Sequence, residues 1–336
     1  MSGYKDIVGN EQIIMHLKNA VKQNKVSQAY ILSGDKGMGK KMIAGTFAMA
    51  LQCEKGGEEP CMECKSCRQA MSMNHPDIRW INHEKPNVIS VDEVRKQLVD
   101  DVQIKPYSSR YKVYIMDEAE KMNIQAQNAI LKTIEEPPEY AVIILLSANI
   151  EVFLPTILSR CVRLDMRMLR RAKIREYLMK EKGIPDYQAD VLAAFAGGNL
   201  GKAIKLASSE HFNELKEEVV RLLKYIGDMQ IYEAVMAVKD CEKYKLEIED
   251  FIDMMMVWYR DVLVFKVSRN MEEMTFKDQY KYIKEQASRI SFNGVEEVLK
   301  AMDKAKVRVR ANVNYDLALE KMFLTLRDAL NGKTDV

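Results

Sequence analysis

The sequence lacks any long apolar run. Its longest apolar stretches, near residues 141–148 and 254–259, fall far below the ~18 residues that a membrane-spanning helix needs. The first ten residues carry charges and have no apolar core, so they do not have the pattern of a signal peptide. We therefore expect a cytoplasmic protein with no membrane partner.

Net charge is also nearly absent. The 51 Lys and Arg residues against 49 Asp and Glu give a formal charge of +2, which excludes a strong overall field that would draw the chain onto nucleic acid. Any contact with DNA must then come from a local patch or from an assembly. With 47% hydrophobic and 30% charged residues, the composition is that of a soluble globular chain, and 336 residues predict two or three domains.

Cysteine is sparse, and its placement is uneven. Four of the six cysteines follow the spacing C-x7-C-x2-C-x2-C, at Cys53, Cys61, Cys64 and Cys67. In a reducing compartment such a cluster favours a metal over disulfides, and two x2 steps let thiolates converge on one tetrahedral centre. Free thiols grouped by chance and an iron–sulfur cluster are the alternatives. The spacing predicts a closed, structural Zn²⁺ site in residues 53–67.

Hydrophobic periodicity divides the chain into three parts. Residues 1–165 alternate short apolar strands with amphipathic helices, which predicts an α/β domain with a parallel sheet covered on both faces. The strands are expected at 30–32, 78–81, 113–116 and 142–147. Residues 166–208 read as a small helical lid with helices at 168–182, 187–196 and 200–208, and residues 209–336 as an all-helical collar domain.

A phosphate loop is expected directly after the first strand. Residues 34–41 read Gly-Asp-Lys-Gly-Met-Gly-Lys-Lys and lead into a helical stretch. In such a loop, Gly34, Gly37 and Gly39 let successive N–H groups point at phosphate oxygens, and Lys40 adds positive charge. Lys41 departs from the pattern, because this position normally carries a Ser or Thr hydroxyl that ligates Mg²⁺. An ammonium group cannot ligate a cation and would repel it.

Two further positions suit a nucleotide site. Asp117 and Glu118 end the strand expected at 113–116, where an Asp can bind Mg²⁺ and the next Glu can orient a water molecule. The alternative is that this acidic pair caps the helix that follows. Lys40, the loop N–H groups and this pair leave open the binding of ATP or ADP, at most weak, while Lys41 argues against Mg²⁺.

Several strings resemble one family. They are residues 28–32, 74–77, 89–95, 112–117, 128–138 and 154–161, with Glu-Glu-Pro-Pro at 135–138 and Ser-Arg-Cys at 159–161. By these strings and the four clustered cysteines, the chain resembles the delta-prime family of bacterial DNA polymerase III clamp-loader subunits, within the AAA+ superfamily. The resemblance covers essentially the whole length.

The resemblance implies a five-subunit ring around primer–template DNA. In such a ring gamma/tau motor subunits bind ATP, delta opens the sliding clamp, and delta-prime is a comparatively rigid stator. It also implies that Arg160 is an arginine finger, which reaches the γ-phosphate held by a neighbouring motor subunit; the alternative is that Arg160 pairs with an acidic group on its own surface. Asn149 would lie near a γ-phosphate as the polar sensor, or else merely cap the turn after it.

Two departures favour the stator over the motor. Gly201 stands where motor subunits carry a sensor arginine, and Lys202 projects about 100° further round the helix, so it does not replace that arginine. Together with Lys41, this predicts no independent ATPase activity. The alternatives are an ATP-hydrolysing gamma/tau-type motor and, from another class, a standalone zinc-dependent DNA-binding protein.

Overall fold

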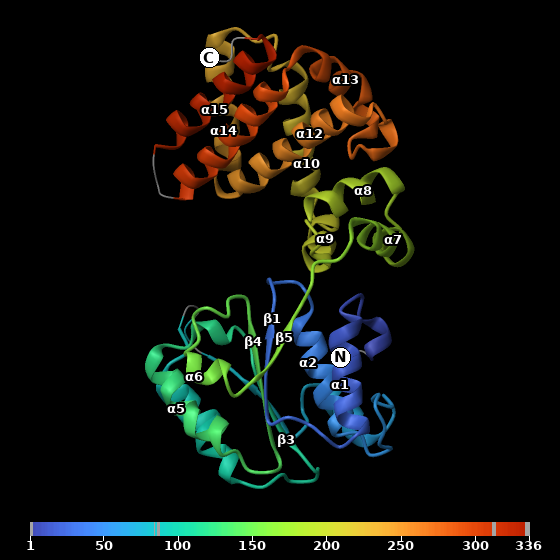
Figure 1. Ribbon diagram of the computed structural model, residues 1–336, viewed down its shortest axis with the longest axis vertical. Helices are drawn as coiled ribbons and strands as arrows, with labels where there is room; N and C mark the ends of the chain where they lie inside the picture. The colour runs from blue at the N-terminus through green and yellow to red at the C-terminus, as the bar shows by residue number, and fades with distance from the viewer. Residues whose placement is uncertain (1–2, 84, 86–87, 311–313, 333–336) are drawn as a thin grey trace. The chain divides into compact units, whose positions relative to one another are not determined.

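The computed structural model describes residues 3–83, 85, 88–310 and 314–332. The chain forms two compact units, residues 1–169 and 170–336 (Figure 1).

The first unit is built on a five-stranded parallel sheet in the order β2-β3-β4-β1-β5. Its strands are β1 (Ala29–Ser33), β2 (Ile78–Ile81), β3 (Lys112–Met116), β4 (Ala141–Ser147) and β5 (Val162–Asp165). The central strands β3 and β4 are buried at every residue, because helices cover both faces of the sheet. The predicted α/β class is confirmed. The edge strand β5 was not among the predicted strands.

Helices lie on both faces of this sheet, as Figure 1 shows for α1 and α2 on one side and α5 and α6 on the other. One buried cluster joins Leu17 and Phe47 to strand residues such as Tyr30, and the other joins Ile130 and Ile157 to residues such as Ile31. The faces alternate because successive strand side chains point to opposite sides. The helices are α1 (Glu11–Lys22), α2 (Lys40–Leu51), α3 (Lys65–Met71), α4 (Val91–Val94), α5 (Ile124–Glu135) and α6 (Pro155–Leu158). Shorter 3₁₀ or π turns cover Tyr4–Asp6, Arg95–Val99, Asp101–Gln103 and Ala119–Lys121.

The second unit is helical throughout its described residues. Its helices are α7 (Arg171–Lys182), α8 (Asp186–Phe195), α9 (Leu200–Ala207), α10 (Glu210–Tyr225), α11 (Ile231–Asp240), α12 (Ile248–Ser268), α13 (Tyr280–Arg289), α14 (Phe292–Arg310) and α15 (Tyr315–Leu330). Short 3₁₀ turns lie at Cys241–Glu247, Met271–Glu273 and Lys277–Gln279. The long helix α12 buries Trp258 and Tyr259 completely.

The three helices expected in the lid occur as α7, α8 and α9, each within a few residues of its predicted bounds. The boundary between lid and collar near residue 208 stays a prediction. Among the described helices, none is long and apolar enough to cross a membrane.

Candidate functional site

The predicted phosphate loop follows β1, a strand inside the sheet, and leads directly into α2. Gly37 and Gly39 both have φ of +93°, a backbone conformation that side-chain-bearing residues rarely adopt. The strand–turn–helix order therefore places the backbone as a phosphate cradle requires. In open α/β sheets ligands bind at this carboxyl edge of the strands.

Groups within the predicted phosphate loop make contacts with one another. The buried Lys40 side chain donates hydrogen bonds to the carbonyl oxygens of Gly34 and Asp35. The Asp35 N–H, one of the donors that would face a phosphate, is 3.1 Å from the sulfur of Met38. Burial lowers the pKa of Lys40, while the charges of Glu120 and Asp117 oppose that shift.

Lys41 pairs with the acidic residue that follows β3. Its Nζ lies 2.8 Å from Oδ2 of Asp117. The ammonium group thus occupies an oxygen of the carboxylate for which the sequence predicted Mg²⁺ binding. Asp117 does not cap the turn after it: the cap position there is Glu118, and no side chain fills that role.

Glu118 is paired with several side chains of its own chain. Its carboxylate lies 2.5 Å from Lys121, 3.6 Å from Lys36 and 3.6 Å from the His83 ring. The hydrogen bond from Lys121 holds the pKa of Glu118 below its usual range. Its backbone has φ of +50°, which is unusual for a residue with a side chain. The residue is therefore engaged by its own chain, whereas a water-orienting role needs an open carboxylate oxygen.

Asn149 caps the turn that follows it, as the alternative to a sensor role predicted. Its Oδ1 accepts a hydrogen bond from the Glu151 N–H at 2.9 Å, and its backbone is tied to the Ser147 hydroxyl. Ser147 is the last residue of β4, and its carbonyl oxygen accepts a hydrogen bond from the Gly34 N–H. Asn149 therefore comes two residues after a strand end that is hydrogen-bonded to the phosphate loop. Its role as a polar sensor stays a prediction.

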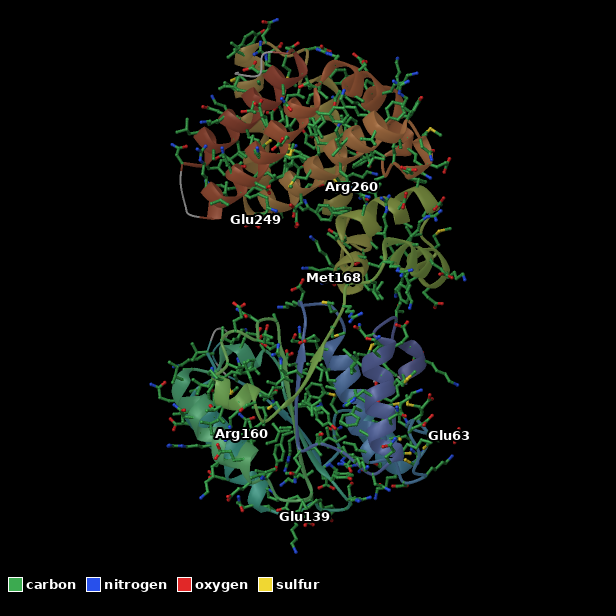
Figure 2. All side chains as sticks on the ribbon, in the orientation of Figure 1. Glu63, Glu139, Arg160, Met168, Glu249 and Arg260 are labelled. Atoms are coloured by element: carbon green, nitrogen blue, oxygen red, sulfur yellow. The ribbon has the colours of Figure 1, made fainter. Side chains whose placement is uncertain are left out.

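Arg160 lies at the amino ends of the parallel strands, whereas the phosphate loop lies at their carboxyl ends. In the parallel register Tyr30 pairs with Val162 and Ser33 with Asp165, so β5 begins where β1 begins. Arg160 precedes β5 and the phosphate loop follows β1, which separates them by at least the ~10 Å length of the strand. Figure 2 shows Arg160 before β5 and Met168 beyond its far end. The arginine is thus remote from its own nucleotide loop.

The Arg160 guanidinium has partners on its own surface. Its Nε lies 3.1 Å from Glu135, and its Nη1 donates to the Thr156 carbonyl at 3.0 Å and to the Ser159 hydroxyl at 3.1 Å. The side chain keeps 40% of its surface exposed. The surface pairing offered as the alternative therefore occurs, and it leaves Arg160 accessible from solvent.

The four clustered cysteines converge as their spacing predicted. The sulfurs of Cys53, Cys61, Cys64 and Cys67 all lie within 4.8 Å of one another. A tetrahedral ion with metal–sulfur distances of about 2.3 Å separates its thiolates by about 3.8 Å, so the donor set fits one metal ion. Backbone N–H groups of Glu63 and Cys64 lower the pKa of the Cys61 thiol to about 6, which favours the thiolate that a metal needs.

His75 is not part of this metal site. Its Nδ1 accepts from the Asp77 N–H at 3.1 Å, so the other ring nitrogen carries the proton and lies 2.9 Å from the Ser66 hydroxyl. The ring is buried, and burial lowers its pKa. His75 therefore joins α3 to β2 as a neutral side chain.

Gly201, the position expected to distinguish a stator from a motor, lies at the start of α9. Gly201 follows Leu200, the first residue of that helix, and it presents no side chain. Lys202 Nζ lies 4.4 Å from the centre of the Phe195 ring and 3.7 Å from Asp250, all within the second unit. Lys202 is thus held by its own unit.

Sequence reasoning missed Glu135 and Met38 as site residues. The position of Glu135 carries a signal in hindsight: it is the last residue of α5 and Glu136 follows it, although acidic groups are unfavourable at a helix C-terminus. The sulfur contact of Met38 has no comparable signal in the sequence.

Two family models match this chain. Residues 9–170 match the model described as DNA polymerase III, delta subunit, and residues 212–328 match DNA polymerase III, delta subunit, C terminal. The chain belongs to this DNA polymerase III subunit family. The resemblance predicted from the sequence is confirmed.

Individual relatives agree with this membership. The DNA polymerase III subunit delta′ of Bacillus subtilis (strain 168) is 29% identical over 322 residues, which cover 94% of this chain and 96% of the relative. The subunit tau of the same organism is 32% identical over 295 residues, which cover 80% of this chain but only 51% of tau. Among solved structures, a gamma subunit-related protein of Thermotoga maritima aligns with a TM-score of 0.46 and 20% identity, covering 94% of this chain and 99% of that one. The chain thus spans nearly all of a delta′ relative and about half of a tau relative.

Proposed function

We propose that this chain is the delta-prime subunit of a bacterial DNA polymerase III clamp loader, which helps to load the sliding clamp onto primed DNA. The observation that carries the proposal is the 2.8 Å contact between Lys41 and Asp117. It puts an ammonium group where a motor subunit would have the magnesium-binding hydroxyl and the ion. A subunit with this contact keeps the nucleotide fold and does not drive its own hydrolysis.

Arg160 supplies the active contribution in this proposal. A guanidinium brought to a neighbouring subunit's γ-phosphate offsets the charge that develops during transfer, an effect of about 10³–10⁵ in rate where it is known. Arg160 lies at the opposite end of the strands from its own phosphate loop, and this position supports a role in trans. Its 40% exposure leaves it accessible to a partner.

The partners in this proposal are the gamma/tau and delta subunits of a heteropentameric ring, with DNA and the sliding clamp bound through the assembly. Residues 166–208 would be the lid and 209–336 the collar that joins subunits. The four cysteines would hold one structural Zn²⁺, a site that stabilises the 53–67 loop and leaves no open position for catalysis. A thiolate site of this kind suits the reducing cytoplasm.

The competing function is a gamma/tau-type motor of the same loader, which the 32% identity to tau favours. The deciding experiment incubates the purified chain with ATP and Mg²⁺, alone and in the reconstituted assembly. We expect no sustained hydrolysis by the chain alone, and a loss of turnover by the assembly when Arg160→Ala replaces the normal chain. Sustained hydrolysis by the isolated chain would reject the stator in favour of the motor. Tight binding of the isolated chain to primed DNA, lost on chelation, would instead favour a zinc-dependent DNA-binding protein.

A further inference from the structure

Glu135 stands where helix electrostatics disfavour it. It is the last residue of α5, and Glu136 follows directly. Carbonyl groups at a helix C-terminus carry partial negative charge, so an acidic side chain there is unfavourable. Local rules are broken in folded proteins mainly where function requires it.

The compensating cation is Arg160. Its Nε lies 3.1 Å from Oε1 of Glu135, and its Nη1 donates to Thr156 and Ser159. A guanidinium has five N–H donors in a planar fork. These contacts engage Nε and Nη1, while the Arg160 side chain keeps 40% of its surface exposed. The guanidinium is therefore held by groups of its own chain and can still be reached from solvent.

The residues before and after Glu135 are held in place by burial and by hydrogen bonds. The preceding residues Thr133 and Ile134 are buried in the first unit. After the helix, the carbonyl oxygens of Pro137 and Pro138 accept hydrogen bonds from the Gln28 side chain at 3.4 and 3.2 Å. Gln28 directly precedes β1, so the turn after Glu135 is fastened to the amino end of the sheet.

From this arrangement we infer that Glu135 is the positioning residue for Arg160. It holds the guanidinium through the ion pair at Nε, so that the exposed part of the side chain can meet an anion brought by a neighbouring subunit. An arginine loses rotamer freedom when it is ordered, and the ion pair with Glu135 takes up part of that loss before the neighbouring subunit binds. The inference rests on the proposed function of Arg160. It gives a role to Glu135, which that proposal does not mention.

The test compares variants in the reconstituted assembly, with kcat and KM for ATP measured separately. Glu135→Ala should lower kcat about ten- to a hundredfold, the loss that a misplaced catalytic contact produces, with KM unchanged. Glu135→Gln should lower kcat less than Glu135→Ala does, because its amide keeps a polar group beside Nε but lacks the charge of the ion pair. Glu136→Ala is the matched control: Glu136 is exposed, adjacent and outside the Arg160 contacts, so it should leave both constants unchanged.

The outcomes separate this inference from the proposed function. If Arg160→Ala lowers kcat and Glu135→Ala does not, Arg160 is a finger that needs no positioning, and the inference is wrong. If Glu135→Ala raises kcat, Glu135 restrains Arg160, and the inference is again wrong. If Arg160→Ala itself leaves kcat unchanged, the finger and its positioning residue both fail. Glu135 is 42% exposed, so these variants should fold, and equal thermal unfolding midpoints would verify it.

Discussion

Nζ of Lys41 and Oδ2 of Asp117 lie 2.8 Å apart beside the predicted phosphate loop, Lys41 at the start of α2 and Asp117 directly after β3. The Lys41 side chain is 65% exposed, and an exposed ion pair contributes only about 0–1 kcal/mol to stability. The pair therefore matters little for folding. Its importance is chemical, because one residue removes a ligand oxygen and adds a positive charge at the same place.

The first prediction concerns Lys41→Thr. The hydroxyl would supply the missing magnesium ligand and release Asp117, so we expect nucleotide binding to become dependent on Mg²⁺. Tightening of at least about tenfold, or about 1.4 kcal/mol, is expected when Mg²⁺ is added. A titration with a fluorescent ATP analogue, with and without Mg²⁺, measures it.

Lys41→Ala is the control for that prediction. It removes the ammonium group without providing a hydroxyl, so it separates the two effects of Lys41. We expect little Mg²⁺ dependence in this variant. Equal gains in Lys41→Ala and Lys41→Thr would mean that the charge alone blocks the metal, and that the missing oxygen is unimportant.

Much of this site could be predicted from the sequence, because local patterns specify it. The glycines of the phosphate loop and the x2 steps of the cysteines determine backbone geometry within a few residues. The carboxyl ends of parallel strands meet at one edge, so placing Asp117 near the loop also required no coordinates. The contact between Lys41 and Asp117 is different. The sequence predicted that Lys41 repels a metal, yet only the fold shows which carboxylate it reaches.

The missed features depend on distant parts of the chain. Strand β5 has only four residues, and its exposure alternates, so its apolar signal is too short to stand out; pairing with β1 makes it a strand. Glu135 was quoted only as part of a family string. Its contact with Arg160 depends on how α5 and the loop before β5 pack, which periodicity does not report.

The second prediction concerns Arg160→Lys. Lysine keeps the positive charge but lacks the planar fork, so it cannot hold Glu135 and a phosphate at once. At the interface that receives this side chain, we expect turnover to fall almost as far as in Arg160→Ala, by about 10³-fold. Single-turnover hydrolysis in the reconstituted assembly measures it. Near-normal turnover in Arg160→Lys would show that charge alone suffices.

The third prediction concerns the metal. Elemental analysis should find about one Zn per chain, since four thiolates make one closed site. Cys61→Ser should lose that metal and lower the unfolding temperature of the first unit, because the loop is attached to α1 through the ion pairs Lys18–Glu59 and Lys22–Glu58. Cys161 lies outside the cluster, so Cys161→Ala should keep the full zinc content. Zinc in Cys61→Ser equal to that of the unchanged chain would remove the assignment.

The fourth prediction contrasts two buried carboxylates. In the first unit, burial opposes the charge of Asp77, but N–H groups of Ser108 and Tyr107 outweigh it and hold its pKa below the usual value. In the second unit, burial raises the pKa of Asp261, and its Oδ1 has no hydrogen-bond partner within the described residues. The two groups should therefore respond oppositely to acid.

The sign follows from proton linkage. The stability from Asp77 is complete above the unfolded pKa of about 3.9 and is lost only as the pH falls through the lower folded value. The penalty from Asp261 is complete above its raised folded pKa and disappears as the pH falls toward 3.9. Acidification from pH 7 toward pH 4 should thus stabilise the second unit through Asp261, whereas the contribution of Asp77 begins to fall only below about pH 5.

Asparagine at each position tests this contrast. At pH 7, Asp77→Asn should lower the free energy of unfolding by about 1–3 kcal/mol, because one amide oxygen cannot satisfy all the donors that face it. Asp261→Asn should leave stability equal or higher, since its oxygen can still accept from the Thr275 and Phe276 N–H groups without a buried charge. The two tryptophans lie in different units, so in a Trp80→Phe background the fluorescence of Trp258 reports unfolding of the second unit alone. If Asp261→Asn kept the full gain in stability on acidification, the proton uptake would belong to another group.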